Sequence, residues 1–481
     1  MKSLTEWTLT QAREALTRGE ISSRELTESY LAAAEAREGS VGAFITRCPE
    51  RALKEADALD KARARGEELP PLAGIPMAVK DNICVQGLST TCASKMLETF
   101  VPPYNATAYE KLQACPLLGK TNMDEFAMGS TTENSAFHVT RNPRDLSCVP
   151  GGSSGGSAAC VAAGEAPFAL GSDTGGSIRQ PAAFCGVVGM KPTYGSVSRY
   201  GLVAFASSLD QIGPMTRTVR DNALVMDALV GYDRRDSTSV KRGYTPMGRQ
   251  LDEGVKGLKI ALPREFFGKG LSAEVKRQVL HAAKLLEKEG AILTEVSIPS
   301  LDYALPAYYV ISSAEASSNL ARFDGVRYGR RTAEYADLEE LYVKSRSEGF
   351  GAEVKRRILL GTYTLSAGYF DAYYKKALQV RTLVIRDMER VMQQCDVILG
   401  PVAPTTAYKL GEKTASPLEM YLGDIYTVPV NIAGIPALSL PCGTDGRGLP
   451  VGVQLMGRTF SEPLLYRVGE ALEKAAVKEA K

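Results

Sequence analysis

Two segments rich in glycine and serine constrain this chain of 481 residues more than any other feature: residues 151–157 read GGSSGGS and residues 171–179 read GSDTGGSIR. A short alanine-rich stretch, residues 158–163, predicts a helix, and a short apolar strand follows it before the second segment. Glycines in such loops either turn the chain or let another group approach the backbone closely. Neither loop contains a lysine or the G-x-x-x-x-G-K-[ST] pattern, which excludes a P-loop. A plain turn explains either loop alone as well as a site does.

The rest of the chain alternates short apolar strands with helices, which is typical of an α/β protein. Four predicted strands in the first half are residues 75–79, 116–118, 168–170 and 187–190. Residues 258–262, a helix capped by Ser272 and residues 292–296 form a predicted β-α-β unit, so part of the sheet should be parallel. Residues 437–440 and 451–455 flank the turn sequence DGRG and predict a hairpin. We therefore expect an α/β fold with a mixed sheet.

The composition gives no global reason to bind nucleic acid or to cross a membrane. Lys plus Arg total 57 against 55 for Asp plus Glu, which leaves a net charge near +2, and no run of five or six basic residues occurs. The N-terminus lacks the apolar core of a secretion signal, and no stretch reaches 18 uninterrupted apolar residues. The nine cysteines include no C-x-x-C pair, which disfavours a disulfide framework or a zinc site. We expect a cytoplasmic protein with no metal site of its own.

Residues 151–155 fit G-x-S-x-G, the turn that presents a nucleophilic serine in α/β-hydrolases. That chemistry needs a histidine, and the chain has only His138 and His281. His281 falls beside the apolar stripe of a predicted surface helix and His138 lies in a polar loop, so solvated roles suit both. A serine can instead use a lysine whose pKa burial has lowered. Lys80, at the end of the strand GIPMAVKDN, is the candidate, although a lysine at a strand end is usually a solvated residue.

Three motifs together resemble those of the amidase-signature family: PMAVKDN around Lys80, then GGSSGGS, then GSDTGGSIRQPA. Ser153 and Ser177 lie 24 positions apart, as the family's motif requires, and the resemblance runs from about residue 24 to the last helix. It implies a large mixed central β-sheet covered by helices on both faces. It also implies a Ser-Ser-Lys triad in which Ser177 attacks an amide carbonyl, Ser153 relays a proton and Lys80 is the terminal base.

The same resemblance implies an oxyanion hole, the set of N–H groups that stabilises the developing negative charge on the carbonyl oxygen. Its donors would be the backbone N–H groups of Thr174, Gly175, Gly176 and Ser177. We expect glycine there because a side chain would keep the carbonyl oxygen away from these donors, and we expect a cis peptide bond near Ser153. Four neighbouring side chains are interpreted as structural. Ser154 and Ser157 are expected to form hydrogen bonds inside the loop, and Asp173 and Arg179 are expected to brace it.

Longer stretches, among them EVKRRILLGTY and GDIYTVPVNIAGIPALSLPCG, resemble the branch of this family that serves glutamyl-tRNA(Gln) and aspartyl-tRNA(Asn) amidotransferases. In that branch the A-type subunit is a glutaminase that passes ammonia to the B-type subunit, and the C-type subunit clamps the pair. The resemblance implies that Arg357 binds the α-carboxylate of glutamine, that Asp424 binds its α-ammonium group and that Tyr308 hydrogen-bonds the substrate. It implies no cofactor in this chain, with ATP and Mg²⁺ in the B-type partner and tRNA bound mainly through that partner.

Each predicted pocket residue also has a structural explanation. Arg357 lies in the charged run EVKRR on a helix face, Asp424 would suit a helix N-cap or a turn, and Tyr309 is as good a candidate as Tyr308. Cys148 stands where a basic residue is common in the family and could alter contacts with a partner. Two other functions remain open, a free-standing amidase acting on small aliphatic or aryl amides and a non-catalytic nucleotide-binding or scaffold protein.

We expect one interlocked domain rather than a string of modules, because no internal repeat or linker interrupts the chain. The predicted division is an N-terminal helical arm in residues 1–23, a single amidase-signature domain in residues 24–466, and the end of the C-terminal helix with its tail in residues 467–481. The first 66 residues are predicted to be helical throughout.

Overall fold

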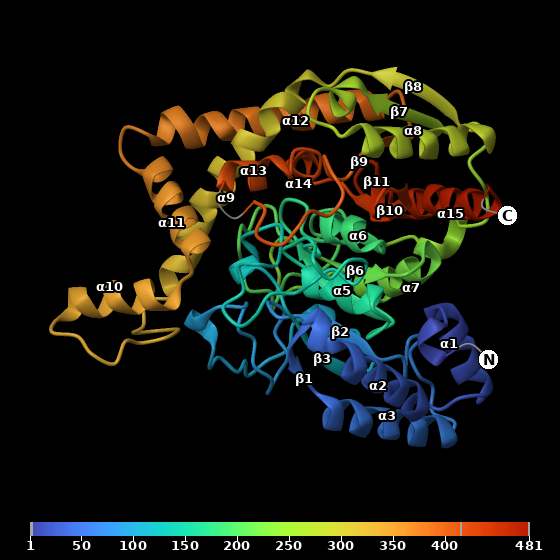
Figure 1. Cartoon of the computed structure of the whole chain (residues 1–481), viewed down its shortest axis with the longest axis horizontal. Coiled ribbons are helices and arrows are strands. Elements are labelled where there is room, and N and C mark those ends of the chain that lie inside the picture. Colours follow the sequence, from blue (N-terminus) through green and yellow to red (C-terminus); the bar gives the residue numbers. More distant parts are fainter. Residues whose placement is uncertain (1–2, 414–415, 480–481) are drawn as a thin grey trace.

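A mixed sheet of eleven strands runs through the computed structural model, which describes residues 3–413 and 416–479 (Figure 1). The order is β1-β3-β2-β4-β6-β5-β10-β11-β9-β7-β8. The strands are β1 (Phe44–Arg47), β2 (Met77–Lys80), β3 (Leu117–Thr121), β4 (Phe168–Asp173), β5 (Val188–Lys191), β6 (Gln211–Thr216), β7 (Lys259–Pro263), β8 (Ile292–Val296), β9 (Val397–Pro401), β10 (Ala437–Thr444) and β11 (Pro450–Met456). Strand β2 is parallel to β3 and β4, and β7 is parallel to β8 and β9, whereas the other neighbours are antiparallel. The predicted mixed α/β sheet is confirmed.

Helices cover both faces of this sheet, as its burial requires. The helices are α1 (Leu9–Arg18), α2 (Ser23–Val41), α3 (Pro49–Ala64), α4 (Thr107–Glu110), α5 (Gly155–Ala162), α6 (Arg179–Cys185), α7 (Val219–Leu229), α8 (Ala273–Lys288), α9 (Ala304–Asn319), α10 (Leu338–Gly349), α11 (Ala352–Leu365), α12 (Lys376–Met392), α13 (Pro417–Leu422), α14 (Val428–Ala433) and α15 (Glu462–Glu479). Strands β2, β4, β6 and β11 are buried at every residue, which is possible only when both faces are packed. Helices α10 and α11 extend away from the sheet, at the left of Figure 1.

The sequence predicted several of these elements closely because their ends carry clear signals. Ser272 caps α8 by accepting a hydrogen bond from Val275 N, and α8 links the parallel strands β7 and β8. Strands β10 and β11 form the predicted hairpin. The prediction of helix throughout the first 66 residues is wrong at β1, which pairs with β3. That strand is only four residues long, and its partner comes about 70 positions later in the chain.

Two large hydrophobic clusters fill the interior. One packs the sheet between α1–α8 and α15 and contains residues such as Val79, Leu170 and Leu455. The other packs beneath α9, α11 and α12 and contains residues such as Tyr308 and Val354. The residues predicted to form a site come from elements of both clusters. No helix in residues 3–413 and 416–479 is long and apolar enough to cross a membrane.

Candidate active site

Lys80 ends strand β2 and is fully buried. Its Nζ lies 2.7 Å from Ser153 Oγ, 2.8 Å from Ser154 Oγ and 3.0 Å from Ser172 Oγ. Burial lowers the pKa of the lysine from 10.5 to about 7, because water no longer stabilises the ammonium form and the neighbouring carboxylates only partly oppose this effect. The structure therefore places a buried amine against three hydroxyl groups. With this pKa, the amine is neutral in about half of the molecules near pH 7.

The two glycine- and serine-rich loops meet beside this lysine. Ser153 follows a cis peptide bond with Gly152, and helix α5 begins two residues later. The loops are joined by a hydrogen bond from Ser154 N to the carbonyl of Ser177, 3.1 Å long. Ser177 is 7 % exposed, and its hydroxyl makes no hydrogen bond to another residue in the described part of the chain. Ser177 is thus held at the junction of the loops with its hydroxyl free for a substrate.

The second loop is organised by Asp173, the last residue of β4. Its carboxylate accepts hydrogen bonds from Gly176 N at 2.8 Å and from Ile178 N at 3.2 Å, and it forms a buried ion pair with Arg179 Nε at 3.1 Å. Burial acts to raise the pKa of Asp173, but Arg179 and Asn431 outweigh it and lower the pKa to about 2. The carboxylate is therefore permanently charged and holds the loop, as the sequence predicted for Asp173 and Arg179.

The predicted oxyanion donors do not all remain available. The N–H of Gly176 is used by Asp173, whereas those of Thr174, Gly175 and Ser177 have no acceptor among residues 3–413 and 416–479. The Thr174 hydroxyl donates to the buried carboxylate of Asp210 at 2.6 Å, which fixes this end of the loop. Three backbone donors on the loop that carries the Ser177 hydroxyl are thus left for a substrate.

Glycine is required at two of these positions by packing against other side chains. A Cβ added to Gly175 would lie 2.5 Å from Tyr308 Oη, and one added to Gly176 would collide with Thr427. Gly176 also has a φ of 136°, a backbone conformation that residues other than glycine rarely adopt. From the sequence, glycine is expected here so that a carbonyl oxygen can approach the loop. The structure adds a second reason for glycine, because the loop lies directly against α9 and the start of α14.

Arg357 is buried on α11, with its guanidinium over the rings of Tyr309 and Tyr421 at 4.5 and 4.7 Å. Its Nε donates to Glu353 Oε1 at 2.7 Å, and its Nη1 is buried without a hydrogen-bond partner in the described part of the chain. Burial opposes the charge, but Tyr309 and Glu353 raise the pKa of Arg357 above its usual value. Arg357 is thus a permanent buried cation with unused donor capacity, and not a residue of the exposed helix face.

Asp424 lies after α13 and accepts a hydrogen bond from Tyr309 Oη at 2.8 Å. Burial raises its pKa to about 7, although Tyr309 and Arg357 act in the opposite direction. Tyr308 and Tyr309 are both buried, and their rings meet in a T-shaped contact. The two tyrosines take different places, because Tyr308 contacts the glycine loop and Tyr309 contacts Asp424 and Arg357.

Sequence reasoning gave Ser154 a different role and missed two buried carboxylates around the triad, Asp124 and Asp210. Ser154 was assigned to hydrogen bonding within its own loop, but its hydroxyl contacts Lys80 and donates to the Ser172 carbonyl at 3.0 Å. Asp124 accepts hydrogen bonds from the backbone of residues 131–134, and burial raises its pKa to about 6. Asp210 is buried in the same way, with its pKa also raised to about 6. Asp124 lies three residues after β3 and Asp210 lies directly before β6, so no motif in the sequence signalled either contact.

Neither histidine belongs to this cluster. His281 is exposed on α8 and pairs with Glu479 at 2.6 Å, as its place beside the apolar stripe predicted. The His138 ring makes no hydrogen bond to Lys80, Ser153 or Ser177 within residues 3–413 and 416–479. Cys148 is fully buried and its thiol donates to Asp145 Oδ2 at 3.3 Å, and an effect on contacts with a partner stays a prediction.

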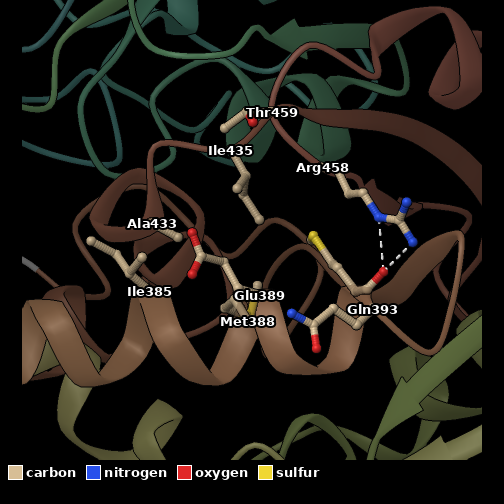
Figure 2. A pocket seen from close by; sticks show the side chains of 9 residues that line it. Ile385, Met388, Glu389, Gln393, Ala433, Ile435, Arg458 and Thr459 are labelled. Carbon is tan, nitrogen blue, oxygen red and sulfur yellow. Dashed lines mark hydrogen bonds between the residues drawn. The ribbon is translucent and has the colours of Figure 1, made fainter.

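A separate pocket lies away from the loops, between α12 and the segment around Ile435 (Figure 2). Its volume is about 470 Å³, and Met388, Glu389 and Thr459 are among its lining residues. Arg458 at its edge donates to the carbonyl of Met392 near the end of α12 at 2.8 Å, which is a structural capping contact. The pocket contains none of the predicted site residues, so we locate the active site at the loops.

Comparisons with known proteins identify the family of the chain. The model of the family described as "Amidase" matches residues 25–466. The A subunit of the glutamyl-tRNA(Gln) amidotransferase of Caldanaerobacter subterraneus subsp. tengcongensis is 58 % identical over 476 residues, covering 98 % of this chain and 97 % of that protein. The protein of the same name from Moorella thermoacetica is 59 % identical over 464 residues, covering 96 % and 95 % of the two chains.

The fold comparison extends this similarity to a solved structure. The crystal structure of the glutamyl-tRNA(Gln) amidotransferase A subunit from Thermotoga maritima superposes with a TM-score of 0.79 at 44 % identity, covering 98 % of this chain and 95 % of that one. The similarity in sequence and the similarity in fold thus both extend over nearly the whole chain. The chain belongs to the amidase family.

Proposed function

We propose that this chain is the glutamine-hydrolysing A-type subunit of a tRNA-dependent amidotransferase. It would supply ammonia for converting Glu-tRNA(Gln) to Gln-tRNA(Gln), or Asp-tRNA(Asn) to Asn-tRNA(Asn), in an ATP-dependent complex. The observation that carries the chemistry is the buried Lys80 amine 2.7 Å from Ser153 Oγ. The names of relatives that are more than half identical over nearly the whole chain support the choice of substrate.

The hydrogen bonds around Lys80 can accommodate a neutral amine as the base. A neutral amine has two N–H donors and one lone pair, whereas an ammonium group has three donors and no acceptor. The Ser154 hydroxyl already donates to the Ser172 carbonyl, so Ser154 Oγ accepts from Lys80. If a second N–H goes to Ser172 Oγ, the lone pair is left facing Ser153. Ser153 then donates its proton to Lys80 when it takes one from Ser177.

In the first half of the reaction, Ser177 Oγ attacks the side-chain carbonyl carbon of glutamine while its proton passes to Ser153 and the Ser153 proton passes to Lys80. The tetrahedral intermediate then collapses. The C–N bond breaks, the leaving nitrogen takes the proton back through the same relay, and ammonia departs. In the second half, water attacks the glutamyl ester on Ser177 by the same relay and releases glutamate.

The negative charge that develops on the carbonyl oxygen would be stabilised by the backbone N–H groups of Thr174, Gly175 and Ser177. These donors are rigid before substrate binds because Asp173 and Asp210 fix the loop from both ends. Rigid donors stabilise a transition state without a reorganisation cost, and one such donor typically contributes about 3 kcal/mol.

The pocket would recognise both charged groups of free glutamine. The unused Nη1 of Arg357 suits the α-carboxylate, because a guanidinium binds a carboxylate through a planar pair of N–H groups. Asp424 would bind the α-ammonium group, for which it must be ionised. Tyr308, whose hydroxyl lies against Gly175, would hydrogen-bond the substrate amide beside the oxyanion donors.

The proposal includes partner chains. We propose that B- and C-type subunits complete the complex and that the chain itself holds no cofactor, with ATP and Mg²⁺ bound by the B-type partner. The same partner would bind most of the tRNA, a view that the near-neutral charge of this chain supports.

The test separates the supply of ammonia from its use. In the assembled complex, Ser177→Ala should abolish transamidation with glutamine and leave transamidation with added ammonium chloride at the native rate. Loss of both activities, or survival of both, would contradict the proposal. If the isolated chain co-purifies with no partner and hydrolyses small aliphatic or aryl amides faster than glutamine, it is a free-standing amidase instead.

A further inference from the structure

The orientation of the Arg357 guanidinium is fixed by groups that no substrate would contact directly. Its central carbon lies 4.5 Å from the ring centre of Tyr309 on α9 and 4.7 Å from that of Tyr421 on α13, and these two rings stack on each other. Cation–π contacts of this kind hold the charge beside the rings but do not decide which N–H groups face the pocket. A further contact must decide which edge faces the pocket.

Glu353 supplies that contact. It lies one helical turn before Arg357 on α11, is 5 % exposed, and its Oε1 accepts from Arg357 Nε at 2.7 Å. The same oxygen accepts from Tyr421 Oη at 2.8 Å, and the other oxygen pairs with Arg356 at the surface. The Glu353 carboxylate therefore binds the Nε edge of the guanidinium and joins α11 to α13.

This contact leaves the outer edge of Arg357 unsaturated. Glu353 binds through Nε alone, and Nη1 stays buried without a partner in the described part of the chain. A buried unpaired donor is costly unless a ligand satisfies it, so its persistence points to a bound group that the Nη edge receives. Had Glu353 bound both Nη atoms, it would have blocked that group.

We propose that Glu353, assisted by the Tyr421 hydroxyl, is a positioning residue that turns the Nη edge of Arg357 toward the α-carboxylate of glutamine. The inference rests on the proposed function. Asp424 accepts its hydrogen bond from Tyr309 and none from Glu353 in the described part of the chain, so the main effect of Glu353 should act through Arg357. Glu353 would then affect the binding of substrate and not the chemistry at Ser177.

The test uses glutamine hydrolysis by the complex with its B- and C-type subunits, followed as glutamate release. Glu353→Gln keeps the size of the side chain and removes its charge. It should raise KM for glutamine by about 10- to 100-fold, because hydrogen bonds to charged groups are strong. The kcat should stay within about twofold of native. Tyr421→Phe removes one hydroxyl and keeps the ring, and should raise KM by about fivefold. Arg356→Gln is the matched control, because it removes only the exposed partner of Glu353, and should leave KM within about twofold of native.

A double-mutant cycle separates positioning from a general loss of structure. In the Arg357→Met background, adding Glu353→Gln should change kcat/KM by less than about twofold, because the group that Glu353 positions is already absent. An additional loss as large as in the native background would overturn the inference, as would a fall in kcat with unchanged KM. If the native complex hydrolyses no glutamine at all, the proposed function fails instead, which is a distinct result.

Discussion

Acylation of Ser177 should depend on pH through Lys80 and Asp424, and the structure gives the shape of the profile. Lys80 must be neutral to accept a proton, and burial lowers its pKa to about 7. Asp424 must be ionised to bind the α-ammonium group, and burial raises its pKa to about 7. Both requirements favour higher pH. The acid limb of kcat/KM, which reports groups of the free enzyme, should therefore approach a slope of two below pH 6.

The magnitude follows from the two pKa values. A lysine at its ordinary pKa of 10.5 would be neutral in about one molecule in 3,000 at pH 7, whereas Lys80 should be neutral in about half. At pH 5 the two groups together should reduce kcat/KM to about 0.01 % of its plateau. With Asp424→Asn one group remains, so the acid limb should have a slope of one and kcat/KM at pH 5 should be about 1 % of that variant's own plateau.

The assay is single-turnover hydrolysis of subsaturating glutamine from pH 5 to 9, quenched in acid and read as glutamate formed. Circular dichroism at each pH checks that the protein stays folded. A profile of Asp424→Asn that is flat between pH 5 and 8, or that still rises tenfold per pH unit at pH 9, would refute a neutral buried Lys80 as the base.

Two substitutions test the geometry around this base. Gly175→Ala should lower kcat by about 100-fold, the effect of displacing an oxyanion donor, because the new Cβ would lie 2.5 Å from Tyr308 Oη. Gly248→Ala is the control and should leave kcat unchanged, because the nearest atom to its Cβ would be at an ordinary 3.6 Å. Equal activity of the two variants would contradict the packing argument. His281→Ala should leave kcat/KM unchanged and move the melting temperature by no more than about 2 °C, since its pair with Glu479 is exposed. A large loss of activity would instead favour a mechanism with histidine as the base.

Local signals in the sequence predicted many of the elements, although not β1, and the pairing of Lys80 with Ser153 came from the family motif. The apolar face of α8 and its cap at Ser272 predicted the β7–α8–β8 unit, because each signal lies within a few residues of the structure it specifies. Lys80 and Ser153 were paired only through the family motif. They are 73 positions apart, and no periodicity in the chain encodes that contact.

The remaining site residues could not be predicted because their roles come from tertiary contacts. Ser172 reaches Lys80 because β4 lies parallel to β2, and parallel neighbours bring their carboxyl ends to one edge of the sheet. Glu353 appeared only as part of a charged run, yet α9 and α13 bury it against Arg357. Strand order and helix packing decide both contacts, and neither is visible in a local pattern.

The most direct test of the Ser177 relay is to trap its covalent intermediate. The complex is mixed with glutamine, quenched in acid within the first turnover, digested and analysed by mass spectrometry. A glutamyl ester should be found on the peptide that contains Ser177 and should be absent after Ser177→Ala or Lys80→Met. An ester on Ser153 or on a cysteine, or an undiminished yield of ester in Lys80→Met, would contradict the account.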